Sequence, residues 1–132
     1  MSASTGPPLQ GRILVVDDLA DAAASLAMVC RLYGAEAAIA GDGIEALSVG
    51  ATFRPDVVLM DITMPNMDGY EAARHLRAQP WGKSVVLIAL TGWGRQADIE
   101  AARHAGFDGH LLKPVEAEAL IDLIGALRSN PR

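Results

Sequence analysis

Five short runs of mainly apolar residues recur along the chain, separated by longer amphipathic segments. They occupy residues 12–16, 36–40, 57–60, 84–90 and 107–112. Runs of this length, bounded by Gly, Pro or Asp and mostly rich in Val, Ile and Leu, are typical of buried β-strands. The run at 36–40 is the weakest, because alanine supplies most of its apolar side chains. The pattern therefore predicts five strands.

Between these runs, apolar residues recur every three or four positions, as on one face of a helix. Helices are predicted over residues 21–33, 44–52, 70–78 and 95–105, and over a last segment that ends near residue 127. The residues expected to face the core are Leu26, Val29, Cys30 and Tyr33 in the first helix, Ile44 and Leu47 in the second, with Ala51 as a further candidate, and Leu120, Leu123, Ile124 and Leu127 in the last.

Strands that alternate with helices predict a parallel sheet with helices on both faces. The length of 132 residues suits one domain. Residues 1–11 are rich in Ser, Thr, Gly and Pro around an isolated Leu9, and they are predicted to form a flexible leader or linker. The folded domain is expected at residues 12–128, followed by a short tail at 129–132.

Composition excludes several classes of function. The net charge is -5 and no run of Lys or Arg occurs, so a nucleic-acid backbone is not expected as a direct partner. No apolar stretch approaches the roughly 20 residues of a membrane span, and the N-terminus lacks the pattern of a signal peptide. We therefore expect a cytoplasmic protein without a membrane contact. The single cysteine, Cys30, is expected to be a small buried hydrophobe.

Polar residues that could take part in binding or catalysis follow the predicted strands: Asp17 and Asp18, Asp61, Thr91 and Lys113. Right-handed crossovers bring the carboxyl ends of parallel strands to one edge, so these residues are expected to converge there. Simpler interpretations exist for each. Asp61 could cap the following loop or helix, Asp17 or Asp18 could be a helix N-cap, Thr91 could simply end its strand, and Lys113 could be a solvated loop lysine.

Three carboxylates at one edge need a compensating charge. Two unit charges about 5 Å apart repel by roughly 3 kcal/mol at an effective dielectric constant of about 20. Mg²⁺ suits such a site best, because it binds one or two carboxylates together with water and phosphate oxygens. Lys113 and Thr91 also suit phosphate oxygens. The remaining carboxylate could then attack phosphorus and form an aspartyl phosphate, with positioning and electrostatics supplying most of the acceleration.

The combination of Asp17-Asp18, Asp61, the segment MPNMDG at 64–69, Thr91 and Lys113-Pro114 resembles the receiver domain of two-component response regulators. The resemblance covers nearly the whole predicted domain. It implies a flavodoxin-like, doubly wound (βα)5 three-layer sandwich with a five-stranded parallel sheet. It also implies a phosphoryl acceptor that acts on its own phosphorylation and dephosphorylation rather than a turnover enzyme.

The resemblance assigns the phosphoacceptor and metal residues. Asp61 would receive the phosphoryl group from a histidine kinase or a histidine phosphotransfer protein. Asp18, Asp61 and the backbone carbonyl of Thr63 would hold Mg²⁺, while Asp17 would act through a water molecule. The cognate kinase and the downstream protein are not identified by these residues.

The resemblance also assigns the switch residues. Lys113 would pair with the phosphoryl oxygens, and Thr91 would move toward the phosphoryl group and draw its loop inward. Pro114 would follow a cis peptide bond that sets the direction of Lys113. The polar face of the helix at 95–105, including Arg95, Asp98 and Arg103, is the candidate signalling surface, because this helix has few large apolar residues and can shift at low cost.

Two positions depart from the family pattern or stand out within it. His110 occupies the place, three residues before the lysine, where the family usually has Tyr or Phe, and we hypothesise that its ring takes over the rotating role. Trp93, two residues after Thr91, should flank the phosphoryl group together with Thr63. Its indole could shield the acyl phosphate from water or could instead face outward as a partner contact.

Three alternatives remain at this stage. The chain could be a receiver excised from a hybrid histidine kinase, with residues 1–11 as a linker remnant. It could be a Mg²⁺-dependent phosphatase with Asp61 as nucleophile, although Thr63 stands where such hydrolases generally carry a second aspartate as general acid. It could also be a non-catalytic flavodoxin-like binding module, which leaves the acid cluster unexplained.

Overall fold

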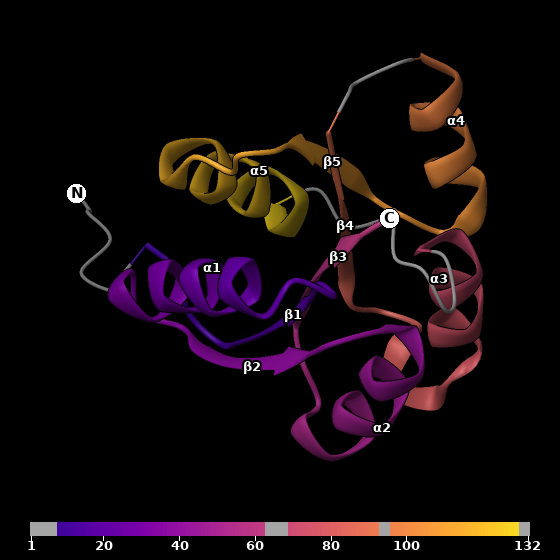
Figure 1. The fold of residues 1–132 in the computed structure, drawn as a ribbon, viewed down its shortest axis with the longest axis horizontal. Coiled ribbons are helices and arrows are strands. Elements are labelled where there is room, and N and C mark those ends of the chain that lie inside the picture. The colour runs from indigo at the N-terminus through magenta and orange to yellow at the C-terminus, as the bar shows by residue number, and fades with distance from the viewer. Residues whose placement is uncertain (1–7, 63–68, 93–95, 130–132) are drawn as a thin grey trace.

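The chain forms a five-stranded parallel sheet, as the strand pattern predicts (Figure 1). The structure is a computed structural model that describes residues 8–62, 69–92 and 96–129. The strands are β1 (Arg12–Val16), β2 (Glu36–Ala40), β3 (Val57–Asp61), β4 (Val86–Thr91) and β5 (Gly109–Leu112), in the spatial order β2-β1-β3-β4-β5. The last two strands begin two residues later than predicted.

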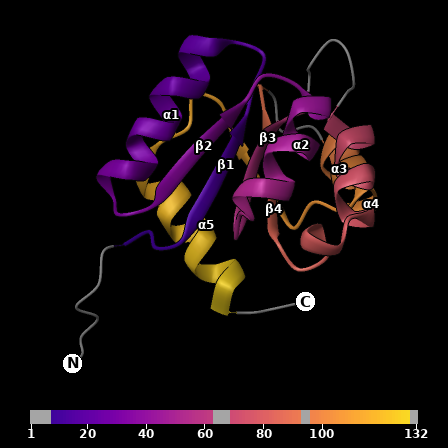
Figure 2. The ribbon, with the colours of Figure 1, turned by 90° about the horizontal axis from the view of Figure 1, so that it is seen from below.

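Helices cover both faces of the sheet and complete the predicted three-layer sandwich. They are α1 (Ala20–Leu32), α2 (Gly43–Phe53), α3 (Gly69–Ala78), α4 (Gln96–Ala105) and α5 (Ala117–Ser129), with a short 3-10 helix η1 (Pro80–Gly82) after α3. Helices α1 and α5 pack on one face, and α2, α3 and α4 pack on the other (Figures 1 and 2). Among the helices within the described ranges, none is long and apolar enough to cross a membrane.

The sheet separates two apolar cores. Successive residues of a strand point to opposite faces, so Leu14 and Val16 pack with α2, α3 and α4, whereas Ile13 and Val15 pack with α1 and α5. All five residues of the central strand β3 are buried, as expected for a strand covered on both faces. The core is made mainly of aliphatic side chains.

The strand order reverses between β1 and β3. From β1 the chain crosses to β2 on one side and then returns to β3 on the other side of β1. In open α/β sheets, ligands bind outside the carboxyl ends of the strands at such a reversal. Asp17 directly follows β1 and Asp61 is the last residue of β3, so the topology predicts the position of the site independently of any motif.

The buried face of α1 differs from the prediction. Ala23, Ala27 and Cys30 are its buried residues, whereas Tyr33 is at the C-cap and is 36% exposed. Leu26 packs at the border of the core rather than in its centre. The small side chains of Ala23 and Ala27 allow α1 to pack closely against the sheet, whose Ile and Val side chains on this face are bulky. Burial of Cys30 is confirmed, and this burial raises the pKa of the thiol to about 11.

The prediction for α2 is also wrong in part. Ile44 is 61% exposed and Ala51 is exposed, while the small residues Ala46 and Gly50 face inward. The ring of Trp81 from η1 occupies the space where a side chain at position 50 would lie. Glycine is needed at position 50 because the Trp81 ring lies directly against the backbone there. The Trp81 indole fills the part of the core that Ile44 of α2 was predicted to fill.

Leu9 belongs to the folded structure rather than to a flexible leader. Its side chain is fully buried in the core beneath α1 and α5, and its backbone N–H donates to the carbonyl of Tyr33 at 2.8 Å. The domain boundary at Arg12 stays a prediction, but ordered packing begins before that residue.

Candidate functional site

Three carboxylates gather at the carboxyl edge of the sheet. Asp61 is the last residue of β3 and is 2% exposed, and Asp17 follows β1 directly and is also buried. Asp18 is exposed next to it. One oxygen of each carboxylate lies within 4.8 Å of the others. The predicted convergence of the three acids is therefore present in the structure.

Lys113 provides a positive charge inside this cluster. Its Nζ donates to Asp61 Oδ2 at 2.7 Å and lies 3.9 Å from Asp17 Oδ2. Burial alone would lower the pKa of Lys113, but the hydrogen bond to Asp61 and the negative charges of all three acids outweigh burial and raise it. The interpretation of Lys113 as a solvated loop lysine is thus wrong.

Asp17 is held in place by the start of the following segment. Its Oδ1 accepts a hydrogen bond from the backbone N–H of Leu19 at 3.0 Å. The N-cap of α1 is Leu19, so neither Asp17 nor Asp18 caps this helix. Burial raises the pKa of Asp17, and the neighbouring Asp61 and Asp18 raise it further, against the lowering effects of the Leu19 N–H and Lys113. The site contains more negative charge than one lysine balances.

Thr91 lies at the same carboxyl edge of the sheet, on the strand next to that of Asp61. It ends β4, is buried, and its carbonyl accepts the backbone N–H of Lys113 at 2.8 Å. Thr91 and His110 line a cavity of about 10 Å³ beneath the first turns of α4, together with Ile62, Ala89, Asp98, Ile99 and Ala102. The cavity is no larger than one water molecule. The structure brings His110 to Thr91, as the switch hypothesis requires.

The acid cluster fits a small divalent cation. Its donors are hard carboxylate oxygens, which Mg²⁺ prefers, and opposite ligands of an octahedral Mg²⁺ lie about 4.2 Å apart. The carboxylate oxygens of the three acids lie within 4.8 Å of one another, so small side-chain movements, or one bridging water molecule, would allow them to bind a single cation. The charge imbalance described above also favours a cation. All three carboxylates are placed to contribute to such a site. The assignment of Asp18 and Asp61 as direct ligands, and of Asp17 as a ligand through water, stays a prediction.

Some predicted site residues lie outside the described residues. These are Thr63, the loop that follows it to Asp68, Trp93 and Arg95. Their assigned roles stay predictions. The peptide bond between Lys113 and Pro114 is cis, as the resemblance implies.

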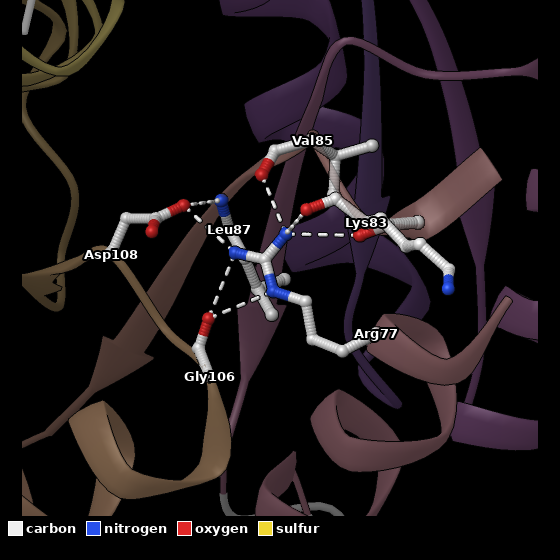
Figure 3. Close-up of polar contacts among 7 residues, drawn as sticks. Arg77, Lys83, Val85, Leu87, Gly106 and Asp108 are labelled. Carbon is white, nitrogen blue, oxygen red and sulfur yellow. Dashed lines mark hydrogen bonds and ion pairs between the residues drawn. The ribbon is translucent and has the colours of Figure 1, made fainter. Parts of the chain in front are cut away.

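A second polar cluster, which the sequence analysis did not predict, lies at the opposite edge of the sheet. It is centred on Arg77 of α3 and Asp108, the residue before β5 (Figure 3). The two residues are 31 positions apart, so no local pattern connects them. A cavity of about 690 Å³ also opens at that edge, lined in part by Trp81, Lys83 and Arg128. It is remote from the carboxylates and has no part in their chemistry.

Comparison with known proteins establishes the class. Residues 13–125 match the family model described as response regulator receiver domain. The fold order and the acidic carboxyl edge agree with this match. The chain belongs to the response regulator receiver family of two-component signal transduction.

Individual relatives give the same class. The chain is 37% identical over 123 residues to the DNA-binding response regulator MtrA of Mycolicibacterium paratuberculosis, covering 92% of this chain and 53% of that protein. It thus spans about half the length of this relative. A putative response regulator from Chloroflexus aurantiacus has a TM-score of 0.84 at 30% identity, covering 92% of this chain and 99% of that one. The receiver domain of the sensor histidine kinase PA1611 from Pseudomonas aeruginosa, solved with magnesium in its active-site cleft, has a TM-score of 0.80 at 33% identity, covering 89% and 96%.

Proposed function

We propose that the chain accepts a phosphoryl group on Asp61 from a histidine kinase or a histidine phosphotransfer protein. The observation that carries this proposal is the position of Asp61: a buried carboxylate at the end of the central strand, 2.7 Å from Lys113 and adjacent to two further acids. A buried carboxylate held against a lysine is pre-positioned as a nucleophile. A purely structural ion pair would not need Asp17 and Asp18 beside it.

The transfer uses the residues at this edge in distinct roles. A carboxylate oxygen of Asp61 attacks phosphorus, the bond from phosphorus to the donor histidine nitrogen breaks, and the electron pair stays on that nitrogen. Lys113 now bonds to Asp61 Oδ2 and would turn to the incoming phosphoryl oxygens as charge builds up there. The hydroxyl of Thr91, at the end of the adjacent strand, would donate to another of these oxygens. No general base is required, because a carboxylate is ionised at neutral pH.

Mg²⁺ is the cofactor that the acid cluster supports. When bound, it would neutralise the carboxylates and the phosphoryl oxygens and thereby lower the repulsion between an anionic nucleophile and an anionic phosphoryl group. Asp18 and Asp61 would hold it, together with the carbonyl of Thr63. The magnesium in the receiver domain of PA1611 supports this assignment.

Phosphorylation would be read out through Thr91 and α4. Thr91 and His110 line the same small cavity as Asp98 and Ile99 of α4, so a displacement of Thr91 toward the phosphoryl group would change the packing of His110 and of this helix. The polar face of α4, including Asp98 and Arg103, is the proposed contact surface for a partner. If His110→Ala left phosphorylation-dependent partner binding unchanged, the role of His110 would be wrong.

Incubation with acetyl phosphate and Mg²⁺ tests the proposal directly. Intact-mass measurement should show the addition of one phosphoryl group to the wild type and none to Asp61→Ala. Addition that survives in Asp61→Ala would place the acceptor elsewhere. Continuous release of phosphate without a stable adduct would instead indicate a phosphatase. In the same assay, faster loss of the adduct from Trp93→Ala would support the shielding role of Trp93, and an unchanged rate would exclude it.

A further inference from the structure

The cavity of about 690 Å³ opens at the edge where the strands begin, here called the amino edge. Its walls come from the residues before β3, the stretch from η1 to the start of β4, the residue before β5 and the last turn of α5. This volume lies within the roughly 300–1,000 Å³ of small-molecule sites. None of the three carboxylates of the phosphoacceptor site lines it.

The lining combines apolar and cationic side chains, as small-molecule sites do. Trp81, Val86 and Leu127 are partly buried and contribute apolar side chains. Lys83 and Arg128 belong to different walls, the first before β4 and the second on α5. Arg128 makes no hydrogen bond or ion pair with another residue in the described part of the chain. Its guanidinium is therefore available to an incoming acceptor.

The two acidic residues of the lining already accept hydrogen bonds from the protein. Asp108 Oδ2 accepts from Arg77 Nη2 and from the backbone N–H of Leu87, both at 2.9 Å. Asp56 Oδ2 accepts the backbone N–H of Arg12 at 2.8 Å. Counted with Arg77, the described charged groups at the cavity are three cations and two carboxylates. One positive charge is left over.

The helix ends make the whole amino edge basic. Each of the five helices has an acidic residue in its first turn, and each ends with an arginine in the last turn or at the C-cap. These arginines are Arg31, Arg54, Arg77, Arg103 and Arg128. The pattern stabilises the helix dipoles. Because every helix runs back toward the strand starts, it also gathers positive charge at the amino edge of a protein with a net charge of -5. Anions are attracted to this edge.

Arg77 holds one wall of the cavity in a fixed shape. Its Nη1 donates to the carbonyls of Gly82 and Val85 at 2.9 and 2.8 Å (Figure 3). These two residues flank Lys83 and Ser84 of the lining. The Arg77 side chain is only 14% exposed, so its bonds are shielded from water. The wall is thus ordered before a ligand arrives, which lowers the entropic cost of binding.

We propose that this cavity binds the phosphate end of a nucleotide-sized small molecule. Arg128 would pair with two phosphate oxygens through its planar donors, and Lys83 would bind a third oxygen as a point charge. Phosphate suits cations that come from different walls, because its oxygens point in several directions. The hydroxyl of Ser84 is a further donor, and Trp81 would contact the organic part of the ligand. The proposal does not depend on phosphorylation of Asp61.

Calorimetric titration with ATP tests the site. EDTA is present and Mg²⁺ is absent, so that no metal ion carries phosphate to the carboxylates. The wild type should bind ATP saturably, and Arg128→Gln should bind it at least tenfold more weakly, because a charge-assisted pair is lost. Lys83→Gln should show a smaller loss. Arg74→Gln is the matched control, because Arg74 is an exposed arginine one turn before Arg77 on α3 and does not line the cavity. It should bind as the wild type does.

Further probes separate the parts of the ligand. Tripolyphosphate should bind more weakly than ATP, and adenosine should not bind. In Trp93→Phe, Trp81 is the only tryptophan, and its fluorescence should change as ATP saturates the site. Asp61→Ala should bind ATP like the wild type, so a failure of phosphoryl transfer would leave this site standing. The proposal is overturned if the wild type does not bind ATP saturably, if folded Arg128→Gln binds it unchanged, if Arg74→Gln loses as much affinity, or if either simpler probe binds as tightly as ATP.

Discussion

The two edges of the sheet use charge in opposite ways. At the carboxyl edge, one lysine faces three carboxylates among the described residues, which leaves an excess of negative charge within this group. At the opposite edge, the guanidinium of Arg77 is surrounded by carbonyl oxygens and one carboxylate. Both clusters form because a parallel sheet brings distant residues together at each edge. The first edge therefore carries the proposed cation and phosphoryl site, whereas the charges of the second edge hold loops in place.

The largest expected effect separates the chemistry of the two edges. Asp61→Asn should abolish phosphoryl addition from acetyl phosphate, because an amide is not a nucleophile toward phosphorus. Asp108→Asn at the opposite edge should retain it. Intact mass after reaction measures both. Labelling of Asp61→Asn, or loss of labelling in Asp108→Asn, would contradict the division of roles between the edges.

The next effect is on stability. Arg77→Met should lower the free energy of unfolding by about 3–5 kcal/mol, because it leaves buried Asp108 without its cation. With saturating Mg²⁺ present, Lys113→Met should lower it by only roughly 1 kcal/mol, because the Lys113 side chain is 30% exposed and the bound cation would compensate buried Asp61 in its place. Urea unfolding at neutral pH provides the measurement, and Arg74→Met should be close to wild type. Equal losses of unfolding free energy in Arg77→Met and Lys113→Met would contradict this difference between the two edges.

Mg²⁺ should stabilise the protein through the carboxyl edge alone. At a free concentration of 100 Kd, it should raise the free energy of unfolding by about 2.7 kcal/mol. Asp18→Asn should lose most of this gain, because it removes a carboxylate without disturbing the core, and Arg74→Gln should keep it. Thermal unfolding with and without Mg²⁺ tests this. A full gain in Asp18→Asn would exclude Asp18 as a ligand.

The smallest effect concerns the pH dependence of Asp17. Since its pKa is raised in the folded state, the folded chain holds this proton at a pH where the unfolded chain has released it. The contribution of Asp17 to stability therefore falls as pH rises from the unfolded pKa near 3.8 to the raised folded value, and then stays constant. Asp17→Asn should remove this fall and raise stability at neutral pH without Mg²⁺, because it removes one of three mutually repelling carboxylates. Urea unfolding at several pH values would show it; a destabilised Asp17→Asn would contradict the sign.

Much of the fold and the carboxyl edge could be predicted from the sequence. Strand ends are local features, and the convergence of Asp17, Asp61 and Lys113 follows from the topology alone. What failed depends on packing between elements. In α1, the side chain of Ala27 is buried against the sheet and the larger Tyr33 is not. In α2, Ile44 is exposed, and the ring of Trp81 from η1 packs against the helix instead.

The pair of Arg77 and Asp108 was missed for a related reason. Charged residues at a helix end and before a strand are usually solvated, and only the assembled fold encloses them. The local sequence around Arg77 does not indicate which loops will lie close enough to bond its guanidinium. The metal-binding and gating roles of Thr63 and Trp93 stay predictions, since these residues lie outside the described ranges.

Leu9 has a consequence for how this module can be joined to other sequences. A fragment cut at Arg12, where the apolar pattern begins, would lose a fully buried leucine worth about 1.5–3 kcal/mol and would leave a hole beneath α1 and α5. A fusion partner placed before the domain would be tethered at Leu9, beside the C-terminal end of α1. The transplantable unit therefore starts at residue 8 or earlier, and a linker in any chimera should be measured from that point.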